Sequence, residues 1–434
     1  MSKLERYPAY KDSGVEWLGE IPEHWEIQKL KFNSKIETGN SISDGQKGNY
    51  ENIEDESYPY IATKDINYDF STIDYSNGLR IPINNKNFKI SNPDTTLICI
   101  EGGSAGKKIA FNTQKICFVN KLASIQSINS NVPKFLYYLT KSYIFKKQFE
   151  LSMNGLIGGV SISTMKNFEL IFPPKEEQTK IASFLDKKTS QIDKTISQKE
   201  KLIELLKERR QITINEAVTK GLDKDVEFKD SGVEWIGEIP KHWEVSKLGT
   251  CLKPISIKNR PELPLLSVTR EQGVILRDVD DKDSNHNFIP DDLSPYKMVE
   301  KGQFAMNKMK AWQGSYGISD YTGIVSPAYY IFELNGIEPT FFHRAIRSSV
   351  YVPFFIKASD GVRIGQWDLS KSRMKEIAFY IPPKDEQIKI VEYIENQTAK
   401  IDKAIELQQN YIAKLGEYKA SLIDSVVTGK VRVA

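Results

Sequence analysis

The sequence has little cysteine and histidine, the residues that most often build disulfides, zinc sites and acid–base centres. The three cysteines, Cys99, Cys117 and Cys251, are odd in number, lie far apart and form no C-x-x-C pair. This spacing argues against a disulfide framework and against a cysteine-rich zinc site. The four histidines show neither H-x-x-x-H nor H-E-x-x-H spacing, so we expect no bound metal.

Long apolar runs and an excess of charge are also absent. No stretch of about 18 apolar residues occurs, and the opening MSKLERYPAYKDSG carries charges where a signal peptide needs an apolar core. We therefore expect a cytoplasmic protein. The 60 basic and 57 acidic residues give a net charge of +3, too balanced to indicate a nucleic-acid partner from composition alone. Any electropositive surface must then be local.

An internal repeat organises the 434 residues, which are enough for two or three domains. The segment YKDSGVEWLGEIPEHWEIQKL at 10–30 returns as FKDSGVEWIGEIPKHWEVSKL at 228–248. A second pair follows, FPPKEEQTKIASFLDKKTSQIDKTI at 172–196 and IPPKDEQIKIVEYIENQTAKIDKAI at 381–405. The stretches between the two repeats barely agree. The chain is therefore two copies of one plan with unlike interiors.

The second repeat predicts two long helices. A Pro-Pro pair ends the strand-like run before each copy, and acidic residues fill the first turn, where the helix dipole favours them. Apolar residues then recur at alternating spacings of three and four, which is typical of a coiled-coil seam. The expected seam residues are Ala182, Leu185, Thr189, Ile192, Ile196, Lys199, Ile203, Leu206, Arg210 and Thr213, and Val391, Ile394, Thr398, Ile401, Ile405, Gln408, Ile412, Leu415, Lys419 and Leu422.

Charge in the seam favours antiparallel pairing of these helices. In parallel register Arg210 would face Lys419, whereas antiparallel pairing brings them near Thr398 and Thr189 respectively. Polar seam residues such as Lys199 would cost stability and could specify the register. The alternative is that they are solvated edge positions.

The unlike segments, 31–167 and 249–376, predict mixed domains. Strand-like runs such as SYPYIAT, TTLICI, LPLLSVT and GIVSPAYYIFEL are separated by Gly, Asn and Pro turns. VPKFLYYLTKSYIFKKQF and IEPTFFHRAIRSSVYVPFF are helical in part. Each segment is therefore expected to form an α+β domain.

Catalytic motifs are incomplete in this sequence. EGGSAGKK at 101–108 differs from a phosphate loop, because Glu101 stands where glycine is required and Lys108 where serine or threonine is required. FPPK and IPPK lack the Asn or Asp that precedes the prolines in amino-methyltransferases. No serine or cysteine lies in a recognisable nucleophile elbow. We therefore expect a non-enzyme.

The repeated phrase is interpreted as structural. His24 and His242 lie between proline and tryptophan, a setting that favours packing over chemistry. The tryptophans are expected to pack each unlike domain against the helices: Trp17, Trp25, Trp235 and Trp243.

Taken together, these blocks resemble the DNA-specificity subunit of type I restriction–modification enzymes. The resemblance is carried by YKDSGVEWLGEIPEHWE, PPKEEQTKIASFLD and PPKDEQIKIVEYIE, which occur in the family's order across essentially the whole chain. It implies an α+β fold with a pseudo-twofold repeat, in which two α/β target recognition domains are separated by two long helices forming an antiparallel coiled coil. The implied domains are 1–170 and 223–379 for target recognition, and 171–222 and 380–434 for the helical spacers.

The resemblance also implies a function. The chain would bind double-stranded DNA at a bipartite, asymmetric target and recruit two methyltransferase subunits and the restriction subunits. S-adenosylmethionine, ATP and magnesium would be held by those partners, and this chain would hold no cofactor and catalyse nothing. Two recognition domains on a rigid spacer suit two half-sites, and pseudo-twofold symmetry would present equivalent surfaces to two copies of a partner.

Candidate DNA contacts are polar and aromatic side chains in strand-to-turn segments at comparable places in the two domains. Arg, Lys, Asn and Gln suit base edges, and Lys, Arg, Ser and Thr suit phosphates. The alternative for each lysine is a solvated surface charge, and for each tryptophan packing. The candidates are Thr63, Lys64, Lys107, Lys108, Asn120 and Lys121 in the first domain, and Thr269, Arg270, Lys308, Lys310, Trp312, Gln313, Arg363, Gln366 and Trp367 in the second.

Three other functions stay open on the sequence alone. A type II system with fused methylation and cleavage uses similar specificity subunits, and the neighbouring gene would distinguish it. A coiled-coil protein whose unlike domains bind other proteins would show no specific DNA binding. A self-contained methyltransferase or nuclease would modify or cut DNA without partners.

Overall fold

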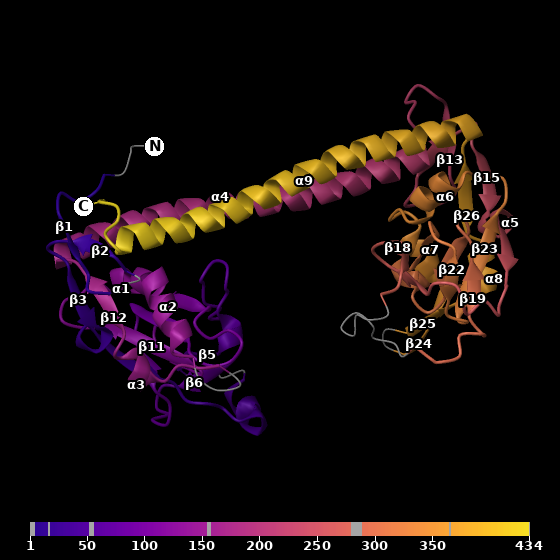
Figure 1. Ribbon diagram of the computed structural model, residues 1–434. Helices are drawn as coiled ribbons and strands as arrows, with labels where there is room; N and C mark the ends of the chain where they lie inside the picture. The colour runs from indigo at the N-terminus through magenta and orange to yellow at the C-terminus, as the bar shows by residue number, and fades with distance from the viewer. Residues whose placement is uncertain are drawn as a thin grey trace. The chain divides into compact units, whose positions relative to one another are not determined.

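The computed structural model describes residues 5–15, 18–51, 56–153, 158–278, 289–363 and 366–433. It divides into two compact units, residues 1–200 with 409–434 and residues 201–408. The division falls within two long helices, α4 (Lys175–Lys220) and α9 (Lys384–Val427), so each unit holds one mixed domain and part of both helices (Figure 1). Among the described residues, no helix is both long and apolar enough to cross a membrane.

The first domain precedes α4 and contains two four-stranded sheets, ordered β4-β11-β8-β9 and β6-β5-β10-β7. Two short pairs, β1-β2 and β12-β3, complete its strands. The elements are β1 Tyr10–Asp12, β2 Glu20–Pro22, β3 Glu26–Lys29, η1 Leu30–Phe32, β4 Ser34–Thr38, η2 Asp44–Tyr50, β5 Ser57–Ile61, η3 Thr63–Asp65, β6 Arg80–Pro82, β7 Ile90–Ser91, β8 Thr95–Cys99, β9 Ile109–Asn112, β10 Ile116–Phe118, β11 Leu122–Ser127, α1 Pro133–Thr140, α2 Tyr143–Leu151, α3 Ile162–Met165 and β12 Glu169–Phe172.

The second domain lies between α4 and α9 in the chain and contains the sheet β16-β23-β20-β21 with several two-stranded pairs. Its elements are β13 Phe228–Asp230, β14 Glu238–Pro240, β15 Glu244–Lys247, α5 Leu248–Cys251, β16 Leu252–Ile255, β17 Leu266–Thr269, β18 Gly273–Leu276, β19 Lys297–Val299, β20 Phe304–Asn307, η4 Ala311–Gln313, β21 Tyr316–Ile318, β22 Gly323–Val325, β23 Tyr329–Leu334, α6 Pro339–Ile346, α7 Val352–Lys357, β24 Ser359–Arg363, β25 Gln366–Leu369, α8 Lys371–Lys375 and β26 Ala378–Ile381.

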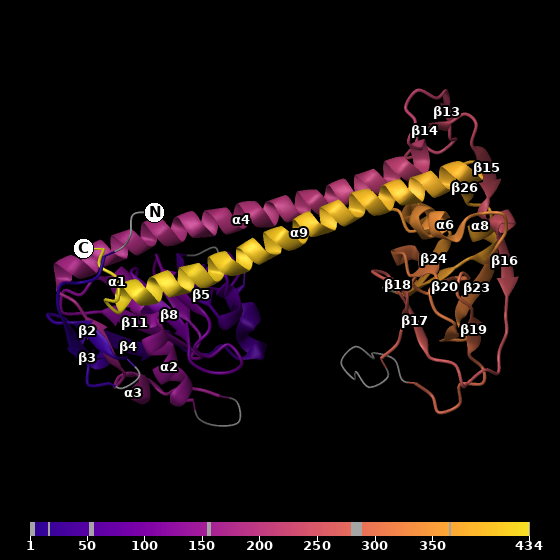
Figure 2. The ribbon, with the colours of Figure 1, turned by 45° about the horizontal axis from the view of Figure 1, so that its top comes forward.

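The two domains share one topology although their sequences barely agree. The sheet β4-β11-β8-β9 has its counterpart in β16-β23-β20-β21. The hairpin β1-β2 (Figure 1) corresponds to the hairpin β13-β14 (Figure 2), and β12-β3 corresponds to β26-β15. The first domain pairs β5 with β10 in parallel. The second domain has a corresponding parallel bridge between Leu265, which directly precedes β17, and Ile324 of β22. The repeat therefore extends through the unlike segments at the level of the fold.

Strand β8 illustrates how the apolar sequence builds this core. All five of its residues are buried, because its two faces pack against different clusters. Ile98 joins the cluster under α1 that contains Phe135, whereas Leu97 and Cys99 join the cluster of the second sheet. A strand buried on both faces is rich in apolar residues, as Leu97-Ile98-Cys99 is, and the two threonines before them are also buried.

Within each unit the long helices pair antiparallel, as expected. In the first unit Asp193 of α4 pairs with Lys419 of α9 at 2.5 Å, and further along α4 the Lys199 ammonium lies 4.5 Å from the centre of the Tyr411 ring. A residue further along α4 thus contacts a residue nearer the start of α9, as antiparallel pairing requires. In the second unit Arg210 pairs with Asp402 at 3.5 Å.

The predicted seam is confirmed, since every seam residue on both helices is buried or half-buried. Lys419 and Arg210 each bind a carboxylate one helical turn beyond the threonine that antiparallel pairing placed near them. Lys199 is half-buried over an aromatic ring, so it is a seam residue with a partner rather than a solvated edge residue.

Candidate nucleic-acid interface

The first-domain candidates come from loops at one edge of its sheets. Because β5 and β10 are parallel neighbours, the loops that follow them leave from the same edge. Thr63 and Lys64 follow β5, and Asn120 and Lys121 follow β10. The turn between β8 and β9 reaches the same place, because the Lys108 Nζ donates a hydrogen bond to the Thr63 carbonyl at 2.8 Å.

Most of these side chains face solvent. Lys64, Lys107, Asn120 and Lys121 are exposed, whereas Lys108 is half-buried. Asn120 accepts a bond from the Ser41 hydroxyl at 2.7 Å. Lys64, Lys107 and Lys121 therefore place three exposed ammonium groups on the loops of this edge, and Lys108 ties two of the loops together.

The segment 101–108 forms a turn between two antiparallel strands, β8 and β9. A phosphate loop instead leads from a strand into a helix, whose N-terminus binds the phosphate. The segment 101–108 therefore lacks the strand-to-helix setting of a phosphate loop. Cys99 lies at the start of this turn, and burial raises the pKa of its thiol, so the thiol stays protonated.

The turn between β17 and β18 carries two second-domain candidates with different roles. The Thr269 hydroxyl donates to the Gly273 carbonyl at 3.2 Å and accepts from the Gln272 amide at 3.1 Å, so Thr269 closes the turn. Arg270 is exposed, and its contact with Glu271 at 3.6 Å is a solvent-screened pair of little strength. Arg270 is therefore the side chain available to a ligand.

The turn between β20 and β21 carries four candidates. Lys310 is exposed, Gln313 is half-buried, and Lys308 pairs with Asp368 of β25 at 3.3 Å. Trp312 stacks on Trp367 of β25 with ring centres 5.1 Å apart and planes 24° apart. The tryptophans therefore pack this turn against the β24-β25 hairpin, which is the packing alternative for both rings.

The Trp312 indole N–H is buried and has no acceptor among the residues that the structure describes. Arg363, the last residue of β24, pairs across the sheet with Gln366, the first residue of β25. The side chains of these two residues lie outside the described part of the structure.

Sequence reasoning missed Arg347, which joins the two second-domain turns. One guanidinium nitrogen donates to the carbonyls of Arg270 at 2.8 Å and Glu271 at 2.9 Å, and the other donates to those of Tyr316 at 2.5 Å and Gly314 at 3.4 Å. All four acceptors are backbone atoms, so no pattern of side-chain types in the sequence announces them. The only sequence signal is a basic residue directly after a helix.

His343 lies beside Arg347 and is fixed as a neutral imidazole. Burial, with the charges of Arg347 and Arg344, lowers its pKa to about 4. Its Nδ1 accepts a bond from the Ile318 amide at 3.1 Å, which requires that nitrogen to be unprotonated. His343 therefore organises the backbone beside the turns.

The repeated phrase docks onto the start of each long helix through one glutamate. In the first unit the Trp25 indole donates to Glu177 at 3.1 Å, and His24 contacts the same carboxylate at 2.6 Å. In the second unit Trp243 and His242 contact Glu386 at 3.1 Å and 2.9 Å. Both indoles are almost completely buried. These residues are structural, as the sequence indicated.

The next residue on each helix makes an equally repeated contact. The buried Gln178 accepts from the Val132 amide at 3.0 Å, at the N-terminus of α1. The buried Gln387 accepts from the Glu338 amide at 2.9 Å, at the N-terminus of α6. Each long helix is thereby joined both to the repeated phrase and to the helix of its own domain.

Trp235 packs differently from Trp25 and Trp243. Trp235 packs against Phe354 at 4.8 Å and donates to the Val350 carbonyl at 3.1 Å, so it contacts the region of α7 within its own domain. The expectation that it packs against the long helices was wrong, because its hairpin carries it toward α7. Trp17 lies outside the described residues.

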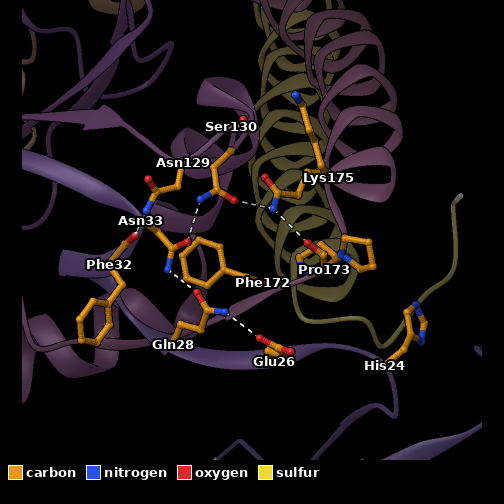
Figure 3. Close-up of a pocket in the computed structure, with 13 residues that line it drawn as sticks. His24, Glu26, Gln28, Phe32, Asn33, Asn129, Ser130, Phe172, Pro173 and Lys175 are labelled. Atoms are coloured by element: carbon orange, nitrogen blue, oxygen red, sulfur yellow. Dashed lines mark hydrogen bonds between the residues drawn. The ribbon is translucent and has the colours of Figure 1, made fainter.

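We call the contact between the repeated phrase and the start of the long helix, at Glu177 in the first unit and Glu386 in the second, the junction of that unit. A pocket of about 520 Å³ opens at the junction of the first unit (Figure 3). A chain of amide side chains lies along its wall: Gln178 donates to Asn131, Asn131 to Asn33, and Asn33 to Gln28 at 2.7, 2.7 and 2.8 Å. Figure 3 labels Asn33 and Gln28 at one end of this chain. Gln28 then donates to Glu26 at 2.7 Å. These bonds connect β3 to α4, so the wall is a structural connection. No group of three or more His, Cys, Asp or Glu side chains suited to a metal occurs among the described residues.

Comparison with known proteins identifies the class. Residues 22–206 match the family described as "Type I restriction modification DNA specificity domain". The chain is 25% identical to the putative type I restriction enzyme MjaX specificity subunit of Methanocaldococcus jannaschii, over 96% of both chains. It is 24% identical to the type I restriction enzyme EcoKI specificity subunit of Escherichia coli K12, over 95% of this chain and 90% of that one.

Solved structures show the same fold. The HsdS subunit from Thermoanaerobacter tengcongensis matches with a TM-score of 0.52 at 15% identity, over 95% of this chain and 98% of that one. A chain from a structure titled as the basis of complex assembly and conformational transition of the type I R-M system matches with a TM-score of 0.67 at 14% identity, over 95% and 99%.

Duplicated mixed domains, each joined to paired long helices, are thus the fold of a specificity subunit. Residues 22–206 belong to the type I restriction–modification DNA specificity family, and similarity to its specificity subunits extends over nearly the whole chain. The resemblance found in the sequence is confirmed.

Proposed function

We propose that this chain is the DNA-recognition subunit of a type I restriction–modification complex and that each mixed domain recognises one half of a bipartite, asymmetric target. The observation that carries this proposal is the equivalence of the two domains. They share one topology, yet their equivalent turns present different polar side chains. A common frame with different contact residues is what two unlike half-sites require.

The first-domain edge offers Lys64, Lys107 and Lys121 to phosphates and Asn120 to a base edge. The second-domain turns offer Arg270, Lys310 and Gln313, all of which are exposed or half-buried. Lys108, Thr269 and Lys308 act within the protein, since their side chains bind neighbouring protein groups, and the backbone carbonyl of Thr63 accepts the Lys108 bond. Phosphate contacts would set the register of each domain, and Arg and Gln would discriminate between bases.

The partners follow from the repeat. The junctions at Glu177 and Glu386 have the same tryptophan and histidine contacts in both units, so they would offer equivalent surfaces to two copies of one methyltransferase subunit. Restriction subunits would join that complex. S-adenosylmethionine, ATP and magnesium would be held by those partner subunits.

In this proposal the chain itself performs no chemistry. Support comes from the groups that most often catalyse. His24 and His242 bind glutamates at the junctions, and His343 is a neutral acceptor from a backbone amide. Burial raises the pKa of Cys99, Cys117 and Cys251, so their thiols are protonated. Each group thus has a structural role or an unreactive form.

Methylation mapping across the host genome tests the proposal. A complex containing this chain should methylate a bipartite motif whose two halves are separated by a spacer of fixed length. Loss of that methylation on deletion of the gene for this chain assigns the motif to it. A short continuous motif would contradict the proposal, as would methylation or cleavage by the purified chain alone.

A further inference from the structure

A basic residue occupies the same position in both domains, directly after equivalent helices. Helices α1 and α6 each contain eight residues, begin with proline and follow equivalent strands, β11 and β23. Lys141 is the C-cap residue of α1, and Arg347 is that of α6. The serine after each donates to the last turn of its helix at 2.6 Å, which confirms the equivalence.

In the first domain Lys141 binds the loop that follows β5. Its Nζ donates to the Ser71 hydroxyl at 2.8 Å and to the Tyr137 hydroxyl at 3.1 Å. Ser71 has a φ of 55°, in the left-handed region, and lies in a tight turn closed by a backbone bond from Asn67 to Thr72 at 2.9 Å. This turn directly follows the candidate contact residues that leave β5.

In the second domain Arg347 binds the turn that follows β17, the equivalent strand. It donates to the carbonyls of Arg270 and Glu271 in that turn, at 2.8 and 2.9 Å. Its other nitrogen binds the turn between β20 and β21. One side chain thus fixes the two turns that carry Arg270, Lys310 and Gln313.

These cations cost stability where they lie. Burial lowers the pKa of Lys141 to about 8 from 10.5 and also lowers the pKa of Arg347, which means that the folded protein disfavours both charged forms. An apolar side chain would fill the same position without that cost. Both cations therefore occupy sites in which charge serves to hold polar loop atoms in place.

We infer that Lys141 and Arg347 are positioning residues for DNA recognition. Lys141 holds the loop after β5, and Arg347 holds the turn after β17, in the geometry that base contact requires. The inference rests on the proposed function. Neither side chain needs to touch DNA. A contact side chain on an unanchored turn would occupy several geometries, so its base contact would lose discrimination.

Other basic residues on the same helices supply matched controls. Lys134 of α1 pairs with Asp186 of α4 at 3.2 Å, and Arg344 of α6 pairs with Glu395 of α9 at 3.6 Å. The Lys134 ammonium also lies 4.2 Å from the centre of the Phe111 ring in β9. Among the described residues, neither Lys134 nor Arg344 has an ion pair with a candidate loop. Replacing either one removes a cation from the same helix but leaves the hydrogen bonds of Lys141 and Arg347 to the loops in place.

The experiment is selection of binding sites from a random-sequence duplex DNA library. The full chain is used in complex with its methyltransferase partner subunit, as wild type and as Arg347→Met, Arg347→Lys, Lys141→Met, Arg344→Met and Lys134→Met. We expect Arg347→Met to reduce preference at the second half-site by about tenfold or more, with the first half-site unchanged. Lys141→Met should do the reverse, Arg347→Lys should lose part of the preference, and the controls should resemble wild type.

Each outcome decides the question. Equal loss at both half-sites, or retained preference in Arg347→Met and Lys141→Met, overturns the inference. Thermal unfolding of every variant checks that the chain is folded, and if Arg347→Lys also fails to fold, the role is structural and the inference is wrong. The proposed function fails differently: the wild-type complex would then enrich no bipartite sequence at all.

Discussion

The indole N–H of Trp25, which is completely buried, donates a hydrogen bond to the Glu177 carboxylate at 3.1 Å. Tyr7 donates to the same oxygen at 3.1 Å, and His24 contacts the other oxygen. The second unit repeats the tryptophan and histidine contacts at Glu386. One carboxylate thus joins the repeated phrase to the long helix in each unit.

Replacing that carboxylate should destabilise the junction. Glu177→Ala leaves a buried indole N–H and a tyrosine hydroxyl without an acceptor, so we expect the free energy of unfolding to fall by about 2–4 kcal/mol. Urea denaturation measures the change. Glu176→Ala removes an exposed carboxylate one residue earlier and should cost less than about 1 kcal/mol. Equal effects of the two substitutions would show that the junction bonds contribute nothing specific.

The ion pair between Asp193 and Lys419 should be coupled energetically. Lys419 is only 12% exposed, so Lys419→Met leaves a partly buried carboxylate unpaired and should cost about 1–2 kcal/mol. The double variant Asp193→Asn/Lys419→Met should cost less than the sum of the single variants. A double-mutant cycle on urea unfolding gives the coupling energy. A coupling energy of zero would mean that the pair does not stabilise the helix pairing.

Stability of the second unit should depend on pH through His343. Its pKa is about 4 in the folded protein and 6.5 when unperturbed, so between these values the unfolded chain binds more protons. Stability is therefore fully present above pH 6.5 and is lost as the pH falls toward 4. His343→Gln should flatten the dependence in this window, measured as free energy of unfolding against pH. An unchanged slope in that variant would contradict the assignment of the slope to His343.

Removing individual recognition side chains should affect one half-site. Arg270→Ala or Gln313→Ala should reduce discrimination at the second half-site by roughly tenfold, because a good bidentate base contact contributes about 1–3 kcal/mol. Competition binding with duplexes scrambled in one half at a time measures this. If binding to duplexes with a scrambled second half fell equally, the two residues would not be contacting those bases.

The first-domain lysines should instead contribute without regard to sequence. Lys64→Ala, Lys107→Ala and Lys121→Ala together should weaken binding to all duplexes and reduce the slope of log K against log salt by up to about 2.7, or about 0.9 for each phosphate contact. Titrations at several salt concentrations measure the slope. A slope unchanged from wild type would place these lysines away from DNA.

Topology explains why equivalent turns were recognisable from the sequence. GGSAGKK and KMKAWQG lie at comparable points in the chain, and they are the β8-β9 and β20-β21 turns of equivalent sheets. Strand-like apolar runs that end in Gly and Asn turns occur in both segments although the segments have diverged, and these runs indicate where the turns lie. Roles of single residues depend on partners far apart in the chain. Lys108 and Thr269 therefore looked like candidates for DNA and are bound to carbonyl groups of the protein.

The sequence by itself determined the duplication, the two long helices, their seam and the family. Repeats and heptad spacing are patterns of residue types along the chain, so they can be detected without any tertiary contact. Only the tertiary structure decided which side chains are free. It brought Arg347 to four carbonyls, stacked Trp312 on Trp367 and directed Trp235 toward α7. Such contacts involve backbone atoms and segments far apart in the chain, so they cannot be recognised from the pattern of residue types along the sequence.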